Sequence, residues 1–240
     1  MKTAINTNIG KKRLTNEDTA HIGSYKDLTV LLIADGMGGH KSGEVASGLA
    51  VDTVKTLLET NYEEGDDLEA FFVDAIEEAN HVIFKASEND ENEGMGTTFA
   101  ALVVRNDDAL VLHVGDSRVY LFRQGELKQL TKDHSLVNEL ARKEPLDDAS
   151  YRRLKHIITR CLGTEGDVKV DRSWIKVEDS DRFLLCTDGL TDEVTSDEME
   201  DILQSENDVQ KNCDQLVDLA LEHGGRDNIT VCMMEYEVKA

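Results

Sequence analysis

Residues 28–60 read LTVLLIADGMGGHKSGEVASGLAVDTVKTLLET and contain both structural patterns of the chain. The first part, residues 28–34, is almost continuously apolar, which is typical of a strand covered on both faces. The run stops at Asp35-Gly36, and a glycine-rich turn follows. From residue 42 onward, apolar residues recur every three or four positions, which predicts an amphipathic helix over 42–60. A buried strand that leads through a tight turn into a surface helix therefore organises this region.

The same two patterns recur along the rest of the chain. Helical spacing returns over residues 68–86 and 209–220, and short β-rich runs cover residues 97–105, 109–114, 118–123, 170–177, 182–186 and 229–235. Because this order is not a regular βαβ alternation, it favours two sheets with helices packed outside them. No linker rich in Pro, Gly or Ser is visible, so we expect one domain over residues 1–240. The polar, highly charged segment at about 143–156 is expected to be a surface flap.

The acidic composition argues against some classes of binding partner. The 240 residues carry 26 Lys+Arg against 49 Asp+Glu, a formal net charge of −23. Nucleic acid and anionic membranes need clustered basic residues, so neither is an expected partner. The first residues lack the apolar core of a secretory signal, and the apolar runs are too short to cross a bilayer. The four cysteines are scattered, which predicts reduced thiols in a cytoplasmic protein.

An apolar run that ends at an aspartate beside a glycine is the most informative motif. It occurs at Asp35-Gly36, Gly115-Asp116 and Asp188-Gly189, and in reverse at Asp227, which comes just before a β-rich run. A single aspartate at a strand end most often caps a turn. Four in one domain favour convergence, and converging carboxylates repel each other unless a cation lies between them. Oxygen ligands select Mg²⁺ or Mn²⁺, and a pair of such ions could activate water and hold a phosphoryl group.

Other catalytic motifs fail on inspection. GMGGHKSG at 36–43 is similar to a phosphate-binding P-loop, but His40 stands where the glycine before Lys41 belongs. GDSRV at 115–119 has Val119 in place of the second glycine of a nucleophile elbow. No cysteine is followed six residues later by an arginine, which argues against a cysteine-dependent phosphatase. A nucleotide-binding switch therefore remains only a remote alternative.

Several motifs in order resemble a known family. They are Arg13-x-x-Asn16-Glu17-Asp18, Asp35-Gly36-Met37-Gly38-Gly39-His40, Gly43-Glu44, Gly96-Thr97-Thr98, Gly115-Asp116-Ser117-Arg118, Asp188-Gly189 and Asp227-Asn228. This set resembles the metal-dependent Ser/Thr protein phosphatases (PPM, protein phosphatase 2C type), and the D-G-M-G-G-H version and short length resemble the bacterial branch. The resemblance runs from about residue 3 to residue 236. Each motif alone is weak, but the ordered set is specific.

The resemblance implies an α+β fold, a four-layer α-β-β-α sandwich of two central antiparallel β-sheets flanked by helices. At one end it implies a centre of two tightly bound Mn²⁺ or Mg²⁺ ions and a weaker third. Asp35 would bridge the two ions, and Gly36 would give its carbonyl to one of them. Asp188 and Asp227 would complete the other ion. Asp116, together with Asp188, matches the weaker third position.

The resemblance also implies roles around the ions. Glu17 and Asp18 would hold metal-bound waters in a fixed orientation. Arg13 would bind the phosphate, since a planar guanidinium suits paired phosphate oxygens; the alternative is a solvated basic cluster with the two lysines before it. His40 beside Asp35 could act as a general acid near neutral pH, or it could be a loop histidine. We assign no site role to the other histidines.

The function implied is a Mn²⁺- or Mg²⁺-dependent protein serine/threonine phosphatase. A metal-bridging hydroxide would attack phosphoserine or phosphothreonine directly, without a phosphoenzyme. The expected partners are phosphorylated proteins, among them a Ser/Thr kinase and its targets, and the protein is expected to be a monomer. The alternative is a catalytically silent, phosphoprotein-binding relative, which should have lost a metal aspartate. In the flap, the family's His-Pro pair is missing between 133–136 (DHSL) and 158–160 (ITR), so substrate preference is the property most open to difference.

Overall fold

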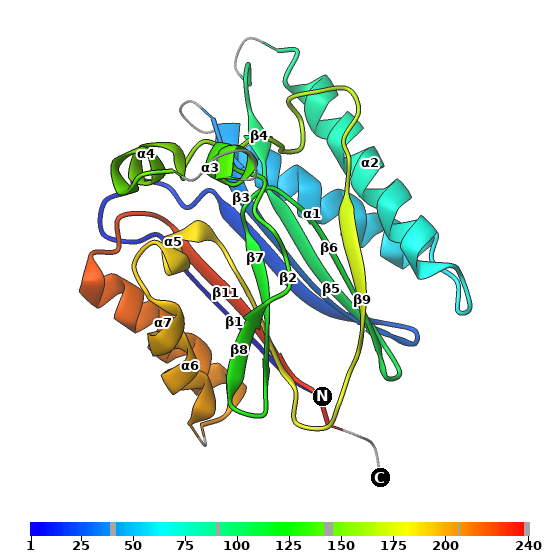
Figure 1. The fold of residues 1–240 in the computed structure, drawn as a ribbon. Helices are drawn as coiled ribbons and strands as arrows, with labels where there is room; N and C mark the ends of the chain where they lie inside the picture. Colours follow the sequence, from blue (N-terminus) through cyan, green and yellow to red (C-terminus); the bar gives the residue numbers. More distant parts are fainter. Residues whose placement is uncertain (39–41, 90–91, 142–145, 206, 238–240) are drawn as a thin grey trace.

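The computed structural model describes residues 1–38, 42–89, 92–141, 146–205 and 207–237. In this part of the chain, two antiparallel sheets pack face to face (Figure 1). The strand order of the first sheet is β1 (Lys2–Asn8), β11 (Ile229–Glu235), β10 (Arg182–Cys186), β7 (Arg118–Arg123) and β8 (Glu126–Gln129). The strand order of the second is β2 (Asp18–Tyr25), β3 (Leu28–Met37), β5 (Phe99–Arg105), β6 (Asp108–Val114) and β9 (Asp171–Lys176), and β4 (Gly96–Thr97) pairs with the end of β3.

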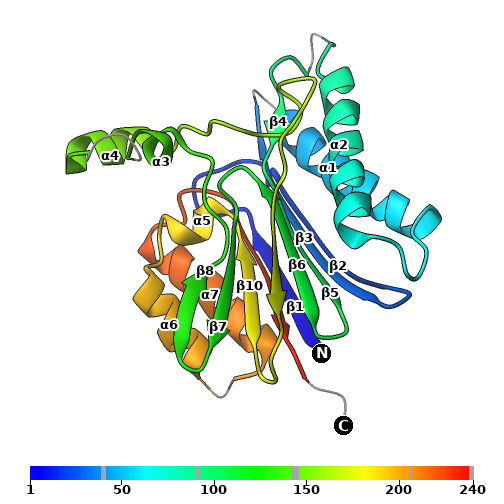
Figure 2. The ribbon, with the colours of Figure 1, turned by 45° about the vertical axis from the view of Figure 1, so that its right-hand side comes forward.

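Helices cover the outer face of each sheet. The second sheet is covered by α1 (Ser42–Thr60) and α2 (Leu68–Ala86), and the first by α6 (Ser196–Gln204) and α7 (Val209–His223) (Figures 1 and 2). The short α5 (Asp188–Thr191) follows β10. Two further short helices, α3 (Leu136–Ala141) and α4 (Asp148–Leu154), lie beyond the sheet ends, on the side of α5. The predicted four-layer arrangement is confirmed. Among the described residues, no helix is long and apolar enough to cross a membrane.

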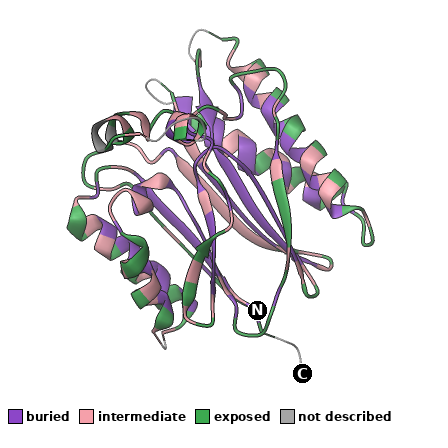
Figure 3. Ribbon diagram, viewed as in Figure 1, coloured by how far each residue is buried: buried purple, intermediate pink, exposed green. Residues whose placement is uncertain are grey.

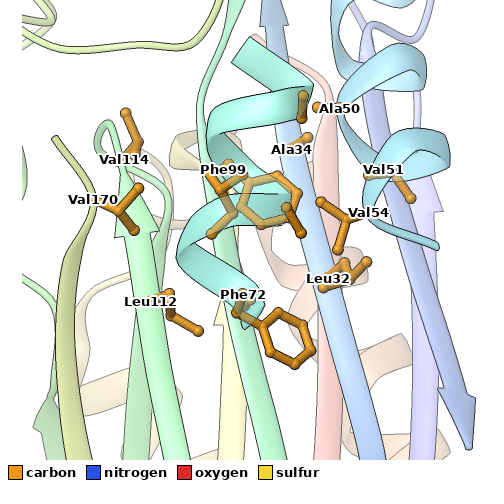
Figure 4. Close-up of a cluster of buried hydrophobic side chains, with 14 of the residues drawn as sticks. Leu32, Ala34, Ala50, Val51, Val54, Phe72, Phe99, Leu112, Val114 and Val170 are labelled. Atoms are coloured by element: carbon orange, nitrogen blue, oxygen red, sulfur yellow. The ribbon is translucent and has the colours of Figure 1, made fainter. Parts of the chain in front are cut away.

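Strand β3 shows why the sequence around it is continuously apolar. Leu31 and Ile33 pack between the two sheets, in the same cluster as Phe183 of β10. Leu32 points the other way, into the cluster under α1 and α2, where Phe72 also lies (Figure 4). Successive side chains of a strand point to opposite faces, so a strand in the middle of four layers needs apolar residues at every position. Figure 3 shows the result, with buried strands inside and exposed faces on the helices.

Candidate metal centre

The predicted acidic residues gather at one end of the sandwich, from strand ends of both sheets. In the second sheet, Asp18 begins β2 and pairs in register with Asp35 near the end of β3. In the first sheet, Asp188 follows β10 and Asp227 comes just before β11, the neighbouring strand. Asp116 lies in the turn between β6 of one sheet and β7 of the other. The fold therefore brings together side chains that are far apart in the sequence.

Burial, and after it mutual repulsion, raises the pKa values of these carboxyl groups. Desolvation, and then the charges of the neighbouring aspartates, raise the pKa of Asp35 well above its usual range. Desolvation is also the main cause that raises the pKa of Asp18 to about 7, of Asp116 to about 7 and of Asp188 to about 6. Asp35 and Asp188 are close enough to share a hydrogen bond. Such a cluster favours either bound protons or bound cations.

Asp18 shows that the site fits hydrated cations. Its Oδ2 accepts hydrogen bonds from Thr187 Oγ1 (3.0 Å) and Thr230 Oγ1 (2.7 Å). Its Oδ1 is buried and has no hydrogen-bond partner among the described residues. A buried acceptor without a donor costs about 1–3 kcal/mol, and a water held by an ion would supply the donor. The acidic side chains gathered here offer only oxygen atoms, which suits Mn²⁺ or Mg²⁺.

Two glycines allow the close packing that the cluster needs. A Cβ on Gly36 would lie 2.0 Å from the backbone oxygen of Gly43 in α1. A Cβ on Gly189 would lie 1.9 Å from the backbone oxygen of Asn228. Both distances are far below contact distance, so any side chain would push the backbone apart. Gly36 thus keeps Asp35 against α1, and Gly189 keeps the start of α5 against the residues before β11.

Arg13 lies at the acidic cluster. Its Nη2 donates to Asp227 Oδ2 at 2.7 Å, and its Nη1 lies 3.7 Å from Glu17 Oε2. The side chain is about half exposed (47%), so the guanidinium is both anchored and open to an incoming anion. Glu17 is buried, and desolvation raises its pKa, although Arg13 opposes the shift. This placement favours a role at the site over a separate solvated cluster.

The structure also reveals supporting residues to which the sequence assigned no role. Asn228 Oδ1 accepts from the backbone N–H of Glu17 (2.9 Å), and its Nδ2 donates to the carbonyls of Ile9 and Thr15, so it holds the Arg13 loop. Thr97 and Thr98 hold the backbone of Asp35 in a similar way: Thr97 Oγ1 donates to its carbonyl, and Thr98 Oγ1 accepts from its N–H. The sequence feature that could have indicated these supporting roles is the side-chain amide or hydroxyl that each of these residues carries within the quoted motifs.

His40, the predicted general acid, lies outside the described residues. The end of the segment predicted as a flap is described, and it reaches the site. Lys155 Nζ lies 2.8 Å from Asp192 Oδ1, and His156 Nδ1 lies 3.3 Å from Asp192 Oδ2. A cavity of about 500 Å³ runs from Asp188 and Asp227 past these residues. The end of this segment and the acidic cluster therefore line one cavity.

Comparisons with known proteins agree with this geometry. The model of the family described as protein phosphatase 2C matches residues 8–219. The serine/threonine phosphatase stp of Listeria welshimeri is 39% identical over 246 residues, which cover 98% of this chain and 96% of the relative. The serine/threonine phosphatase of S. agalactiae has a TM-score of 0.91 and 34% identity, and covers 98% of this chain and 99% of its own. The catalytic domain of the phosphatase PstP, solved with two manganese ions, has a TM-score of 0.84 and 36% identity, with 97% and 96% covered.

Proposed function

Because the chain belongs to the protein phosphatase 2C family, as a metal-dependent Ser/Thr phosphatase, we propose that the acidic cluster is its catalytic centre. The substrates are phosphoserine and phosphothreonine in proteins. The observation that carries the proposal is the convergence of Asp18, Asp35, Asp188 and Asp227 from both sheets, with Arg13 beside them. One domain over residues 1–240, a monomer in the cytoplasm, performs the reaction. A Ser/Thr kinase and its targets are among the substrates.

Two Mn²⁺ or Mg²⁺ ions fit this site, as in the PstP structure. Asp35 would contribute to both ions, the Gly36 carbonyl to one of them, and Asp188 and Asp227 to the other. Asp116, together with Asp188, would hold a weaker third ion. When bound, the ions would supply an activated hydroxide for direct hydrolysis and would neutralise the phosphoryl charge, so no phosphoenzyme would be needed.

The chain's own side chains bind the phosphate and direct the protons. Arg13 exchanges its contact with Asp227 for paired contacts to phosphate oxygens, which its half-exposed guanidinium permits. Asp18 uses its free Oδ1, and Glu17 its carboxylate, to orient water beside the phosphorus. His40 gives a proton to the serine or threonine oxygen as it leaves. The silent-relative alternative is less favoured because Asp35, Asp188 and Asp227 are all present.

A phosphate-release assay on a phosphothreonine peptide with added Mn²⁺ tests the proposal. Wild type should release phosphate, excess chelator should stop it, and Asp35→Asn should abolish it because a bridging ligand loses its charge. Asp52→Asn, on the exposed face of α1, is the matched control and should keep wild-type activity. Full activity in excess chelator, or no release by wild type with Mn²⁺, would refute the proposal.

A further inference from the structure

His134, in the segment between β8 and α3, holds both peptide groups of Gly115. Its backbone N–H donates to the Gly115 carbonyl (2.9 Å), and its ring Nδ1 accepts from the Gly115 N–H (3.0 Å). Gly115 has a φ of +103°, and a Cβ there would lie 2.7 Å from Thr98. Its conformation is therefore available to glycine and little else. The next residue is Asp116, so the two hydrogen bonds of His134 hold the backbone directly before that carboxylate.

A hydrogen bond sets the state of one nitrogen of this ring. Because the Gly115 N–H donates to Nδ1, that nitrogen is an acceptor and carries no proton. Nε2 lies 3.4 Å from Asp171 Oδ2, and Arg160 Nη1 donates to Asp171 Oδ1 at 2.7 Å. The ring is stacked on His113, with centroids 4.6 Å apart and planes 14° from parallel. Burial is the main cause that lowers the pKa of His134 to about 4, so the ring stays neutral near pH 7.

A separate metal site is conceivable beside this ring, because possible ligand atoms of His113, His134 and Asp171 lie within 4.8 Å of one another. The hydrogen bonds of these residues argue against a metal site there. His113 Nε2 lies 3.0 Å from the carbonyl of Lys132, and a carbonyl only accepts, so that nitrogen carries a proton and has no free lone pair. Arg160 Nη1 already occupies the position between Asp171 and His134, 2.9 Å from Nε2. This group is a hydrogen-bonded support.

The same segment also holds the other end of the Asp116 turn. The guanidinium of Arg118 makes paired bonds to Asp133, with Nε 3.0 Å from both carboxylate oxygens and Nη2 2.7 Å from Oδ2. We propose that His134 is a positioning residue that aims Asp116 at the weak third ion. The inference rests on the proposed function in one respect, the assignment of that ion to Asp116.

His134 also connects this turn to the flap. Its carbonyl accepts from the N–H of Thr159 (2.8 Å), and the next residue, Ser135, forms a β-bridge with Ile158. These contacts join the two ends of the excursion that contains α3 and α4. One residue therefore holds both the base of the flap and the backbone of Asp116. A change in His134 should alter the weak ion and leave the tight pair in place.

Two substitutions separate positioning from general support of the fold. His134→Phe keeps a ring to stack on His113 but loses the acceptor for the Gly115 N–H. His134→Asn loses the ring but offers a side-chain oxygen near the position of Nδ1. His21→Phe is the control, because His21 bonds Tyr25 on β2, and it should leave both activity and Mn²⁺ binding unchanged. Each folded protein is titrated with Mn²⁺ by calorimetry, and phosphate release is measured as a function of Mn²⁺.

We expect His134→Phe to weaken the weakest Mn²⁺ site about tenfold or more, the usual effect of losing a residue that supports a ligand. The Mn²⁺ needed for half-maximal activity should rise equally, while the two tighter sites stay near wild type. Loss of the acceptor for the Gly115 N–H should lower the thermal midpoint by several degrees. His134→Asn should recover most of the loss. The inference would be overturned if His134→Phe bound the weakest Mn²⁺ as tightly as wild type, or if both variants lost the same affinity. Weakening of all the sites together, or a wild type with no weaker site, would also overturn it. If wild type binds Mn²⁺ but releases no phosphate, the proposed function fails, and calorimetry still decides the role of His134.

Discussion

Asp18→Asn should stabilise the metal-free protein and at the same time remove activity. The carboxyl group of Asp18 has a pKa raised from 3.8 to about 7, chiefly because it is desolvated. A raised pKa means that the folded protein binds more protons than the unfolded chain between pH 4 and pH 7. The free energy of unfolding therefore falls as pH rises through that window, and the full penalty is present at pH 8. Asparagine carries no charge and escapes the penalty.

The size of the effect follows from the shift. Each pKa unit corresponds to about 1.4 kcal/mol, so the penalty from Asp18 at pH 8 is on the order of 4 kcal/mol. The amide oxygen of asparagine can still accept from Thr187 and Thr230, so those two hydrogen bonds need not be lost. For a chain of this length, 1 kcal/mol moves the thermal midpoint by about 2–4 °C. We expect metal-free Asp18→Asn to melt about 8–16 °C above wild type at pH 8, and at nearly the same temperature at pH 4.

Thermal unfolding in excess chelator, measured at pH 4, 6 and 8, tests this expectation, with Asp52→Asn as a control for the loss of an exposed charge. Added Mn²⁺ should then stabilise wild type more than Asp18→Asn, because the ion offsets the cost of a buried charge that the variant does not carry. A variant that is less stable than wild type by the same amount at every pH would refute the reasoning, since it would show that Asp18 contributes through packing.

The other predictions concern single contacts. Arg13→Ala should raise KM for phosphopeptides and lower kcat, and Arg13→Lys should recover little because an ammonium cannot make the paired contact. Unchanged kinetics in both variants would favour the alternative, in which Arg13 belongs to a solvated basic cluster. Gly189→Ala should lower the free energy of unfolding by about 1–3 kcal/mol in denaturant titration, because its Cβ overlaps the backbone of Asn228; equal stability would contradict that packing. His40→Ala should slow phosphopeptide hydrolysis on the order of 10²-fold, but p-nitrophenyl phosphate much less, since nitrophenolate leaves without a proton. Equal losses on the two substrates would exclude the general acid.

The sequence predicted the buried elements well. The helix expected over 42–60 is α1, and the one expected over 68–86 is α2, with the same bounds. The run at 118–123 is β7. These elements each bury a stripe or both faces, so their apolar residues are dense and regular. Periodicity reports burial, and it is strongest where burial is most complete.

The strands missing from the prediction are β1, β2 and β8, and each lies at the edge of its sheet. Strand β2 has mostly intermediate exposure, and β8 is mostly exposed. An edge strand pairs on one side only and mixes polar with apolar residues, so its pattern is weak. The acidic residues of the cluster were predicted because they interrupt apolar runs. The role of His134 was not, because the ring acts on the backbone of Gly115, a contact that only the folded chain creates.

The origin of the site residues explains why the ion site and the stability of the protein are coupled. Asp18 and Asp35 come from the second sheet and Asp188 and Asp227 from the first, so the spacing of these carboxylates depends on how the sheets pack. That packing is a mostly aliphatic cluster of side chains such as Ile33, in which close-packed atoms leave little room for adjustment. The hydrogen bonds from Thr187 and Thr230 to Asp18 cross between the sheets at the same end. The core thus holds the carboxylates together against their repulsion, and a bound cation turns that repulsion into affinity. Substitutions between the sheets should therefore change metal affinity even where they touch no ligand.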